Sequence, residues 1–437
     1  MNVRIIKPPR GGSVRAIASK SEAHRMLLCA ALADGETFIT CHERSEDIDA
    51  TVRCLESMGA VLKVDQDGYL VSPIVRGDDA ARERNLCCGE SGSTLRFLLP
   101  VCGALGLNAS FHMGGRLPER PLDALHGEMA LNGCTLSEMG RSPLHCKGQL
   151  QSGAYTLPGN ISSQFISGFL FALPLLKGAS VLRVTGDLES RPYVDITLET
   201  LRLFGVSVFE QWSEGRGKRQ EGIGESCVFH IPGGQVFRAP VDVCAGGDWS
   251  NAAFWLALGA IGESGVTCTG LDMDSRQGDR AVVELLMRFG AKVTCEGDTV
   301  TVLPGPLRGI DIDAGDTPDL VPILAVIACA AEGKTTIRNA GRLRMKESDR
   351  LSTVAESLSD LGADISQTET GLLINGKKPL IGGRTRSFGD HRIAMAAAIL
   401  SAVCSGAVEI SGAEAVNKSY PGFFDDFRSA MGGRIDD

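Results

Sequence analysis

The sequence predicts an α/β protein of two similar domains, each built from three βαβαββ repeats. The first observation behind this prediction is an amphipathic helix that returns six times, followed each time by a glycine and a strand. A glycine directly after such a helix is typical of a helix C-terminus. Successive glycines are spaced by roughly 70 to 85 residues, which indicates internal duplication. The six glycines are Gly59, Gly133, Gly205, Gly290, Gly362 and Gly432.

The second observation is a further helix in each repeat that is apolar nearly all round, as expected of a buried helix. Three of these helices precede residue 235 and three follow it, so each domain should hold three of them. They are predicted to begin near Ser21, Ser91, Ser162, Trp249, Pro318 and His391.

Glycine and proline mark two places where the chain is expected to cross between the domains. One is the glycine pair at residues 11–12, and the other is the glycine- and proline-containing segment 233–240. We therefore predict one domain from residues 13–239. The other domain takes residues 1–12 plus 240–437 and so includes the first strand of the chain.

The amino-acid composition indicates which classes of molecule the protein can bind. A net charge of -9 at pH 7 argues against nucleic acid, because proteins that bind it usually present a basic patch. Fourteen cysteines without a CxxC pair are typical of reduced thiols in a cytoplasmic protein, and their spacing matches no metal site. The longest apolar runs, residues 321–331 and 393–403, are too short to cross a bilayer. We expect a cytoplasmic protein with small-molecule partners and no metal, membrane or nucleic acid.

The stretch from Arg342 to Arg350 carries the strongest functional signal, with four cations and two carboxylates in nine residues. If residues 342–346 are extended, the cationic side chains fall on one face. Ser348 could then cap a helix whose first turn contains Arg350. A cation there opposes the helix dipole unless it holds an anion. An isolated charge run is more often a solvated surface, so the rest of the chain has to decide.

Cations recur at the starts of the buried helices. Polar residues at a helix start are usually only caps, and that explanation is sufficient for Ser250 and Thr317. Caps do not explain cations beside the positive end of a helix dipole, whereas anions bound at helix N-termini do. These cations are Lys20, Arg25, Arg96 and Arg392.

With these motifs in view, the chain resembles the EPSP synthases, the 3-phosphoshikimate 1-carboxyvinyltransferases of the shikimate pathway. The resemblance covers nearly the full length and keeps the order of all the motifs. The fold of that family is two inside-out α/β barrels of three repeats each. The matching residues are Lys20 with Ser21 and Arg25, Gly92 with Arg96, Glu119-Arg120-Pro121, Gly159-Asn160 with Ser162-Ser163-Gln164, Ser190 with Pro192 and Tyr193, Pro318-Asp319, Lys346-Glu347 with Asp349-Arg350, Asp390-His391-Arg392, and Lys418 with Tyr420 and Pro421.

The resemblance implies a transferase that moves the enolpyruvyl group of phosphoenolpyruvate to the 5-hydroxyl of shikimate 3-phosphate and releases phosphate. The reaction serves chorismate and aromatic amino acid biosynthesis, and the family is the target of glyphosate. No cofactor is implied, and we expect a monomer. Holding two phosphates and two carboxylates without a metal requires many Arg and Lys donors and helix N–H groups, which the motifs supply.

The resemblance also assigns roles residue by residue. Shikimate 3-phosphate would be bound by Lys20, Ser21, Arg25, Ser162, Ser163, Gln164, Ser190, Asp319 and Lys346. Phosphoenolpyruvate would be bound by Lys20, Gly92, Arg120, Gln164, Arg350, Arg392 and Lys418. The catalytic residues would be Asp319 and Glu347, as proton donor and acceptor, together with Lys20.

Two other families remain as alternatives. UDP-N-acetylglucosamine enolpyruvyl transferases carry a reactive cysteine after a Gly-Gly pair, whereas Gly114 and Gly115 here precede a loop without cysteine. RNA 3′-phosphate cyclase-like proteins share the repeat topology, but the acidic charge disfavours them. Three residues depart from the common EPSP synthase pattern, namely Glu90, Ser93 and Arg342, and the first two bear on glyphosate sensitivity.

Overall fold

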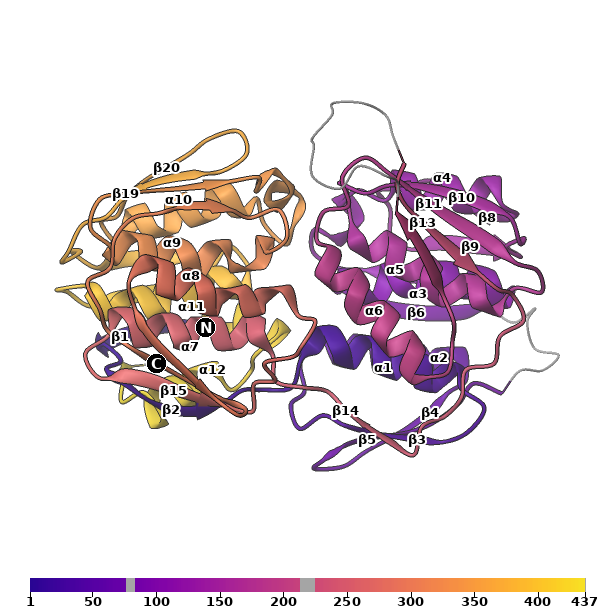
Figure 1. The fold of residues 1–437 in the computed structure, drawn as a ribbon, viewed down its shortest axis with the longest axis horizontal. Coiled ribbons are helices and arrows are strands. Elements are labelled where there is room, and N and C mark those ends of the chain that lie inside the picture. The colour runs from indigo at the N-terminus through magenta and orange to yellow at the C-terminus, as the bar shows by residue number, and fades with distance from the viewer. Residues whose placement is uncertain (76–82, 213–224, 437) are drawn as a thin grey trace. The chain divides into compact units, whose positions relative to one another are not determined.

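The computed structural model describes residues 1–75, 83–212 and 225–436. Contacts divide the chain into two compact units, coloured by residue number in Figure 1. Unit 1 comprises Met1–Ser19, Glu43–Ser45 and Gly246–Asp437, and unit 2 comprises Lys20–His42 and Glu46–Ala245. The two units are described separately below.

Unit 2 holds three four-stranded sheets, with strand orders β14-β3-β5-β4, β6-β7-β9-β8 and β10-β11-β13-β12. Its helices are α1 (Lys20–Leu32), α2 (Glu46–Met58), α3 (Gly92–Leu105), η1 (Leu117–Glu119), α4 (Asp123–Leu131), α5 (Ser163–Ala172), η2 (Leu173–Leu175) and α6 (Arg191–Leu203). Its strands are β3 (Thr37–Thr40), β4 (Val61–Val64), β5 (Gly68–Ser72), β6 (Arg84–Gly89), β7 (Ala109–Met113), β8 (Cys134–Leu136), β9 (Leu144–Gly148), β10 (Ala154–Pro158), β11 (Ser180–Thr185), β12 (Phe209–Trp212), β13 (Glu225–Ile231) and β14 (Asp242–Cys244).

Unit 1 repeats the plan, with sheets β22-β23-β1-β24, β16-β17-β15-β2 and β18-β19-β21-β20. Its helices are α7 (Trp249–Ile261), η3 (Gly278–Ala281), α8 (Val282–Phe289), η4 (Pro318–Leu320), α9 (Val321–Ala330), η5 (Gly341–Met345), α10 (Arg350–Asp360), α11 (His391–Leu400), η6 (Ser401–Val403), η7 (Ala413–Lys418) and α12 (Phe423–Ser429). Its strands are β1 (Asn2–Lys7), β2 (Gly11–Arg15), β15 (Gly265–Thr269), β16 (Lys292–Glu296), β17 (Thr299–Leu303), β18 (Asp311–Asp313), β19 (Lys334–Arg338), β20 (Asp364–Gln367), β21 (Leu372–Asn375), β22 (Gly383–Arg386), β23 (Val408–Ser411) and β24 (Arg434–Asp436).

Each sheet begins with a parallel strand pair and continues antiparallel, as in β6 and β7 followed by β9 and β8. Read along the chain, this is the βαβαββ repeat, and the predicted α/β class with three repeats in each half is confirmed. The sheets lie outside a core of helices in each unit (Figure 1). The predicted helix-ending glycines all have positive φ, from 68° at Gly432 to 109° at Gly59 and Gly290.

Two strands complete sheets far from their place in the sequence. β2 precedes α1 along the chain, yet it pairs in parallel with β15 of unit 1. β14 precedes α7, yet it pairs in parallel with β3 of unit 2. These pairings move the unit boundaries to 19/20 and 245/246, a few residues beyond the crossings at 12/13 and 239/240 expected from glycine and proline.

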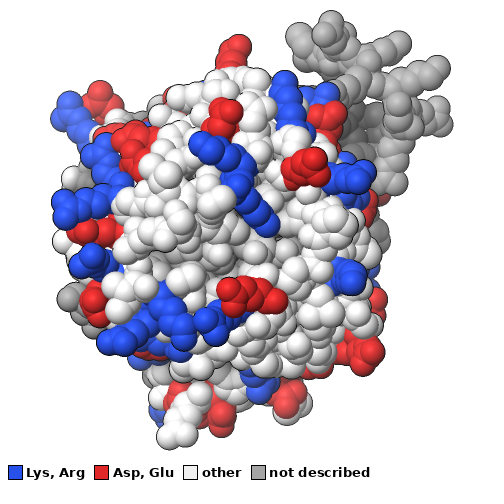
Figure 2. All heavy atoms as spheres, turned by 90° about the vertical axis from the view of Figure 1, so that its left-hand side faces the viewer, with Lys and Arg blue, Asp and Glu red and all other residues white. Residues whose placement is uncertain are grey.

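The six buried helices have buried side chains on all sides, because each one packs inside a ring of sheets and neighbouring helices. In α9, for example, all ten residues are buried. No helix in the described parts of the chain is long and apolar enough to cross a membrane. On the face shown in Figure 2, acidic and basic side chains are interspersed rather than gathered into a basic stripe.

Helices α3 and α5 approach each other unusually closely in the core of unit 2. Pro100 lies inside α3 and has no N–H, so the carbonyl of Arg96 lacks its usual donor from the next turn. Gly168 of α5 packs directly against that carbonyl, and a Cβ placed there would lie 2.3 Å from the Arg96 oxygen. The glycine is therefore required by the approach of the two helices.

We predict that Gly168→Ala lowers the free energy of unfolding by about 1–3 kcal/mol or more, because the two backbones must separate. Gly127→Ala in α4 is the matched control, since a Cβ there meets no atom within 4 Å. Alanine should raise helix stability there by about 0.5–1 kcal/mol. Urea denaturation of both variants tests this, and equal stabilities would contradict the proposed packing.

Candidate active site

A buried guanidinium organises the unit 1 part of the candidate site. The Arg350 side chain is 1% exposed and hydrogen-bonds three carboxylates at 2.7 Å each. Its Nε donates to Asp390, Nη1 to Asp319 and Nη2 to Glu347. Burial alone lowers the pKa of Arg350, but the three carboxylates, led by Asp390, more than offset this and raise it above its ordinary value. The side chain is therefore a permanent cation.

Asp390 joins the starts of two helices through this guanidinium. It is fully buried and caps α11, accepting the backbone N–H of Arg392 at 3.0 Å. It also accepts hydrogen bonds from Arg350, in the first turn of α10, and from the hydroxyl of Ser348 at 3.1 Å. The predicted role of Ser348 as the cap of α10 is wrong, because Asp349 accepts the N–H of Ser352 instead.

Asp319 faces three cations. Besides Arg350, the ammonium of Lys346 lies 3.4 Å from Oδ1 and the guanidinium of Arg392 lies 3.6 Å from Oδ2. Arg392 also donates to the Asp319 backbone carbonyl at 3.0 Å. Lys418, at the end of η7, donates to the carbonyl of Gly389 at 2.7 Å, directly before α11 begins. The unit 1 residues predicted from the resemblance thus gather around the starts of η4, α10 and α11.

The charged residues of the stretch 342–350 have two different roles in the structure. Residues 341–345 form the 3₁₀ helix η5, so the condition under which the cations of this stretch would share one face of a strand is not met. Arg342 donates to the carbonyl of Gly315, and Arg344 donates to Asp349 and to the carbonyls of neighbouring loop residues. These two arginines hold loops, whereas Lys346, Glu347 and Arg350 enter the carboxylate cluster.

In unit 2, α1 carries two cations within its first two turns. Lys20 forms an ion pair of 2.8 Å with Asp47 in the first turn of α2. Arg25 is buried, and its hydrogen bonds run to the hydroxyl of Thr197 and to the backbone carbonyls of Ser21 and Tyr193. Burial lowers the pKa of Arg25 to about 10, which still leaves it charged at neutral pH. A buried cation bound to neutral acceptors is suited to an anionic ligand.

The starts of α3 and α5 are joined by a polar network. Gln164 accepts from Arg96 at 2.7 Å and donates to the hydroxyl of Ser93 at 2.9 Å. Ser162 caps α5 by accepting the backbone N–H of Gln164. Ser163, in the first turn of α5, is also buried. This network brings the predicted serines and Gln164 into the neighbourhood of α3.

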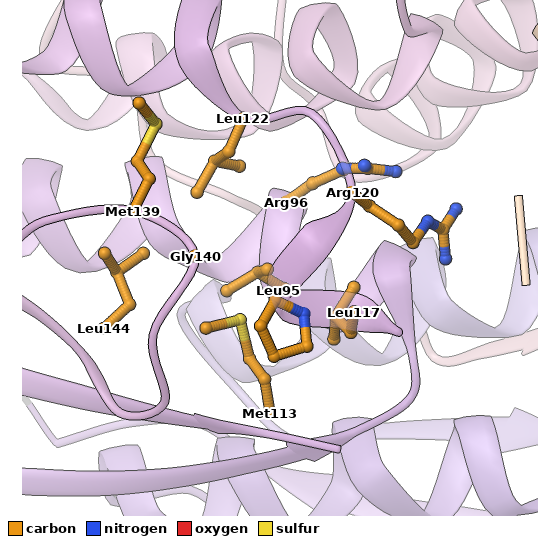
Figure 3. Close-up of a pocket in the computed structure, with 10 residues that line it drawn as sticks. Leu95, Arg96, Met113, Leu117, Arg120, Leu122, Met139, Gly140 and Leu144 are labelled. Atoms are coloured by element: carbon orange, nitrogen blue, oxygen red, sulfur yellow. The ribbon is translucent and has the colours of Figure 1, made fainter. Parts of the chain in front are cut away.

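Arg120 lies over the start of α3. Its Nη1 is 2.9 Å from where a Cβ of Gly92 would be, so a larger residue there would displace the guanidinium. Arg96 and Arg120 also line a small cavity whose other walls are mainly apolar. In Figure 3 the cationic ends of these two arginines lie on one side of the cavity, away from Met139 and Leu144.

Ser190 has a strained backbone. Its φ of 54° and ψ of 38° lie in the left-handed region, directly before α6. Such strain in a residue other than glycine is concentrated at functional sites. The Ser190 carbonyl accepts the N–H of Tyr193, whose own carbonyl is a partner of Arg25. Ser190 and Arg25 are thereby linked through the backbone of Tyr193.

The predicted residues therefore form two sets, one in each unit. The unit 1 set is Asp319, Lys346, Glu347, Arg350, Arg392 and Lys418. The unit 2 set is Lys20, Ser21, Arg25, Gly92, Arg120, Ser162, Ser163, Gln164 and Ser190.

Comparisons with known proteins identify the family of this chain. The family model of EPSP synthase (3-phosphoshikimate 1-carboxyvinyltransferase) matches residues 6–427. A 3-phosphoshikimate 1-carboxyvinyltransferase of Clostridium kluyveri is 43% identical over 98% of this chain and 96% of its own length. The chain belongs to the EPSP synthase family.

Further relatives support the family at the level of sequence and of fold. A 3-phosphoshikimate 1-carboxyvinyltransferase of Clostridioides difficile is 39% identical over 100% of this chain and 98% of its own length. The structure of an EPSP synthase from Acinetobacter baumannii matches with a TM-score of 0.79 at 25% identity, covering 100% of both chains. An enolpyruvyl transferase from Streptomyces tendae, at 20% identity and a TM-score of 0.75, covers 100% of this chain and 98% of its own and shares the fold.

Sequence reasoning missed several residues in this EPSP synthase-family site. Asp47 and Asp279 carry no motif signal, because each meets its partner only through tertiary packing. Asp390 and Arg96 were recognised in motifs but were not assigned to the site. Their positions at the starts of α11 and α3, next to assigned residues, were the available signal.

We predict that Gly92→Ala moves Arg120 and weakens the binding of phosphoenolpyruvate, the substrate that Arg120 is expected to contact. The flexible end of an arginine can yield, so the variant should fold normally. The KM for phosphoenolpyruvate should rise about tenfold, which corresponds to about 1.4 kcal/mol. Gly127→Ala serves as the control. An unchanged KM for phosphoenolpyruvate in Gly92→Ala would contradict the expected contact between Arg120 and this substrate.

A second prediction concerns Asp279, a carboxyl group that is 2% exposed in η3. The hydroxyl of Ser250 donates to Oδ2, and Oδ1 has no hydrogen-bond partner among the described residues. Burial raises the pKa of Asp279 to about 6; Asp319 and Asp248 add to this, and Arg392 opposes it. In the unfolded chain an aspartate has a pKa of about 3.9.

Between about pH 4 and pH 6 the folded protein should therefore keep a proton that the unfolded chain releases. The proton bound to Asp279 makes its full contribution to the free energy of unfolding below about pH 4. This contribution is lost as the pH rises through about 6. Relative to Asp279→Asn, the wild-type free energy of unfolding should fall by roughly 2–3 kcal/mol over this range. Denaturation at several pH values measures it, with exposed Asp274→Asn as control. A constant difference between wild type and Asp279→Asn would contradict the assignment.

Proposed function

We propose that this chain transfers the enolpyruvyl group of phosphoenolpyruvate to the 5-hydroxyl of shikimate 3-phosphate, yielding 5-enolpyruvylshikimate 3-phosphate and phosphate. The observation that carries the proposal is the Arg350 cluster, in which Asp319 and Glu347 are held on one guanidinium among further cations. Two carboxylates in a cationic environment are suited to proton transfer on an anionic substrate. Membership of the EPSP synthase family supports the same reaction.

Shikimate 3-phosphate is proposed to bind mainly to the members of the unit 2 set other than Gly92 and Arg120. Its phosphate would be held by Ser162, Ser163 and Ser190, because serine hydroxyls beside the positive ends of the α5 and α6 dipoles are suited to an anion. Arg25 and Ser21 would hold the rest of the ligand. The neutral partners of Arg25 support this role, since no carboxylate hydrogen-bonds to it among the described residues and its charge is available to the ligand.

Phosphoenolpyruvate is proposed to be held by Arg120, Gln164 and the backbone at Gly92 together with Arg350, Arg392 and Lys418. Lys20 and Lys346 would contact both substrates, with Gln164 and Asp319 also contributing to shikimate 3-phosphate. Arg350 has its N–H groups directed at carboxylates, so it orients the acid and base as well as contributing positive charge. Arg120 and Arg392 are then the main guanidinium partners for the phosphate and carboxylate of this substrate.

The proposed reaction proceeds by addition and elimination. The 5-hydroxyl oxygen of shikimate 3-phosphate attacks C2 of phosphoenolpyruvate while a carboxylate takes the hydroxyl proton and an acid protonates the methylene carbon. The tetrahedral ketal phosphate then loses a proton from that methyl group, and the bond from C2 to the phosphate oxygen breaks. Asp319 and Glu347 are the acid and base, and Lys20, Lys346 and Arg392 stabilise negative charge on the phosphate.

Variants of the two carboxylates test the mechanism. Asp319→Asn and Glu347→Gln should each lower kcat by about 10²–10⁴-fold, because general acid–base catalysis typically contributes that factor. Binding of shikimate 3-phosphate, measured by calorimetry, should change much less. Glu356→Gln is the matched control, since Glu356 pairs with Arg386 at the exposed side of α10. Near-normal turnover by folded Glu347→Gln would remove Glu347 from the mechanism.

The reaction itself is tested by phosphate release from phosphoenolpyruvate with either shikimate 3-phosphate or UDP-N-acetylglucosamine as acceptor. Release is expected only with shikimate 3-phosphate. Release only with the nucleotide sugar would overturn the proposal. A cytoplasmic location and a monomeric state stay predictions from the sequence.

A further inference from the structure

A chain of four buried side chains crosses unit 2 behind the predicted ligands. The His24 ring nitrogen Nδ1 lies 2.7 Å from the Thr51 hydroxyl, which lies 2.6 Å from the Thr94 hydroxyl. Thr94 Oγ1 in turn donates to the hydroxyl of Ser91 at 2.7 Å. All four side chains belong to residues no more than 3% exposed. The chain links α1, α2 and the start of α3, and the proposed mechanism does not use it.

The start of α3 limits how hydrogens are arranged along this chain. Ser91 is the N-cap, so its oxygen already accepts the backbone N–H of Thr94 at 3.3 Å. Two arrangements remain for the hydroxyls. In one, His24 carries its hydrogen on Nδ1 and every hydroxyl donates toward Ser91. In the other, which would reverse the hydrogen bond from Thr94 to Ser91, every hydroxyl donates toward His24, whose hydrogen is then on Nε2.

The surroundings of His24 Nε2 favour the first arrangement. This atom is buried and has no hydrogen-bond partner among the described residues. A buried N–H without an acceptor is rarer in proteins than an unpartnered acceptor, because the donor loses its only interaction. Burial, with Lys20 and Arg25 adding to it, holds the pKa of His24 well below 6.5, so the ring is neutral at pH 7. A neutral ring with its hydrogen on Nδ1 leaves only a lone pair unpartnered.

We propose that His24 is a positioning residue for phosphoenolpyruvate, acting as an Nδ1–H donor that orders Thr51, Thr94 and Ser91 and thereby fixes the first turn of α3. That turn contains Gly92, against which Arg120 lies, and Ser93, which accepts a hydrogen bond from Gln164. The inference rests on the proposed function, because it takes Arg120 and Gln164 as ligands of phosphoenolpyruvate.

The same geometry predicts that shikimate 3-phosphate is affected less. Its proposed ligand Arg25 is held by Thr197, Ser21 and Tyr193, and none of these belongs to the chain. Lys20 is held by Asp47. Loss of the His24 hydrogen bond should therefore disturb the start of α3 while leaving these contacts in place. A residue that only stabilises the fold would change both substrates alike.

The first experiment is a direct observation of the tautomer. Nitrogen NMR of ¹⁵N-histidine-labelled full-length protein at pH 7, with His24→Asn to assign the signal, should show His24 neutral and protonated on Nδ1. A neutral ring protonated on Nε2, or an imidazolium, would overturn the inference. This measurement requires no substrate, so its outcome is independent of whether the proposed reaction is correct.

The second experiment compares substitutions that keep or remove the donor. Asparagine places its amide nitrogen close to the position of Nδ1, so His24→Asn should retain near-normal kinetics. His24→Leu removes the donor and should raise the KM for phosphoenolpyruvate about tenfold, with less than about a twofold change for shikimate 3-phosphate. His112→Leu on β7 is the control. Two outcomes would show that His24 only stabilises the fold. One is an equal change in the KM values for phosphoenolpyruvate and shikimate 3-phosphate, and the other is an equal effect of His24→Asn and His24→Leu.

Two variants of Thr94 provide an independent test if His24→Leu does not fold. Thr94→Ser keeps the hydroxyl and should behave like the wild type, whereas Thr94→Val breaks the chain and should raise the KM for phosphoenolpyruvate selectively. Wild-type kinetics in folded Thr94→Val would overturn the proposal.

Discussion

The buried guanidinium of Arg350 is the interaction on which unit 1 depends. A charge withdrawn from water is tolerated only when it is paired and hydrogen-bonded, and Arg350 meets that requirement with three carboxylates. Those carboxylates come from η4, from the segment between η5 and α10, and from the cap of α11. One side chain therefore sets the relative positions of three helix starts. Removing Arg350 would leave three buried or half-buried anions without their shared partner.

Unit 2 also buries a guanidinium, but neutral acceptors rather than carboxylates hold it. Its buried Arg25 donates to two backbone carbonyls and a hydroxyl. Neutral acceptors satisfy the geometry of a guanidinium without neutralising its charge. Unit 1 thus combines its cations with the carboxylates that proton transfer needs, while unit 2 preserves positive charge for anionic substrates. This division agrees with the proposed roles of the two sets.

Close approach of main chains is the second constraint, and it explains residues that carry no charge. Gly168 lets α5 reach the carbonyl that Pro100 leaves free in α3, and Gly92 lets Arg120 lie on the first turn of α3. Both contacts involve the helix that Ser91 caps. The position of α3 is consequently determined from three sides, by α5, by Arg120 and by the hydrogen-bond chain from His24.

The sequence by itself determined the features that depend on near neighbours. The helix-ending glycines, the βαβαββ repeats and the starts of the buried helices were predictable from periodicity and spacing. The motif residues were assigned through the resemblance to the EPSP synthase family. Local rules were insufficient at residues 342–348. The segment considered as a strand is a 3₁₀ helix, and Asp349 rather than Ser348 caps α10, while the Ser348 hydroxyl donates to Asp390. Only the tertiary structure decided which cation pairs with which anion, how β2 and β14 complete distant sheets, and that His24 joins the start of α3. These contacts link residues far apart in the chain, 172 positions for Arg25 and Thr197, and spacing carries no information about them.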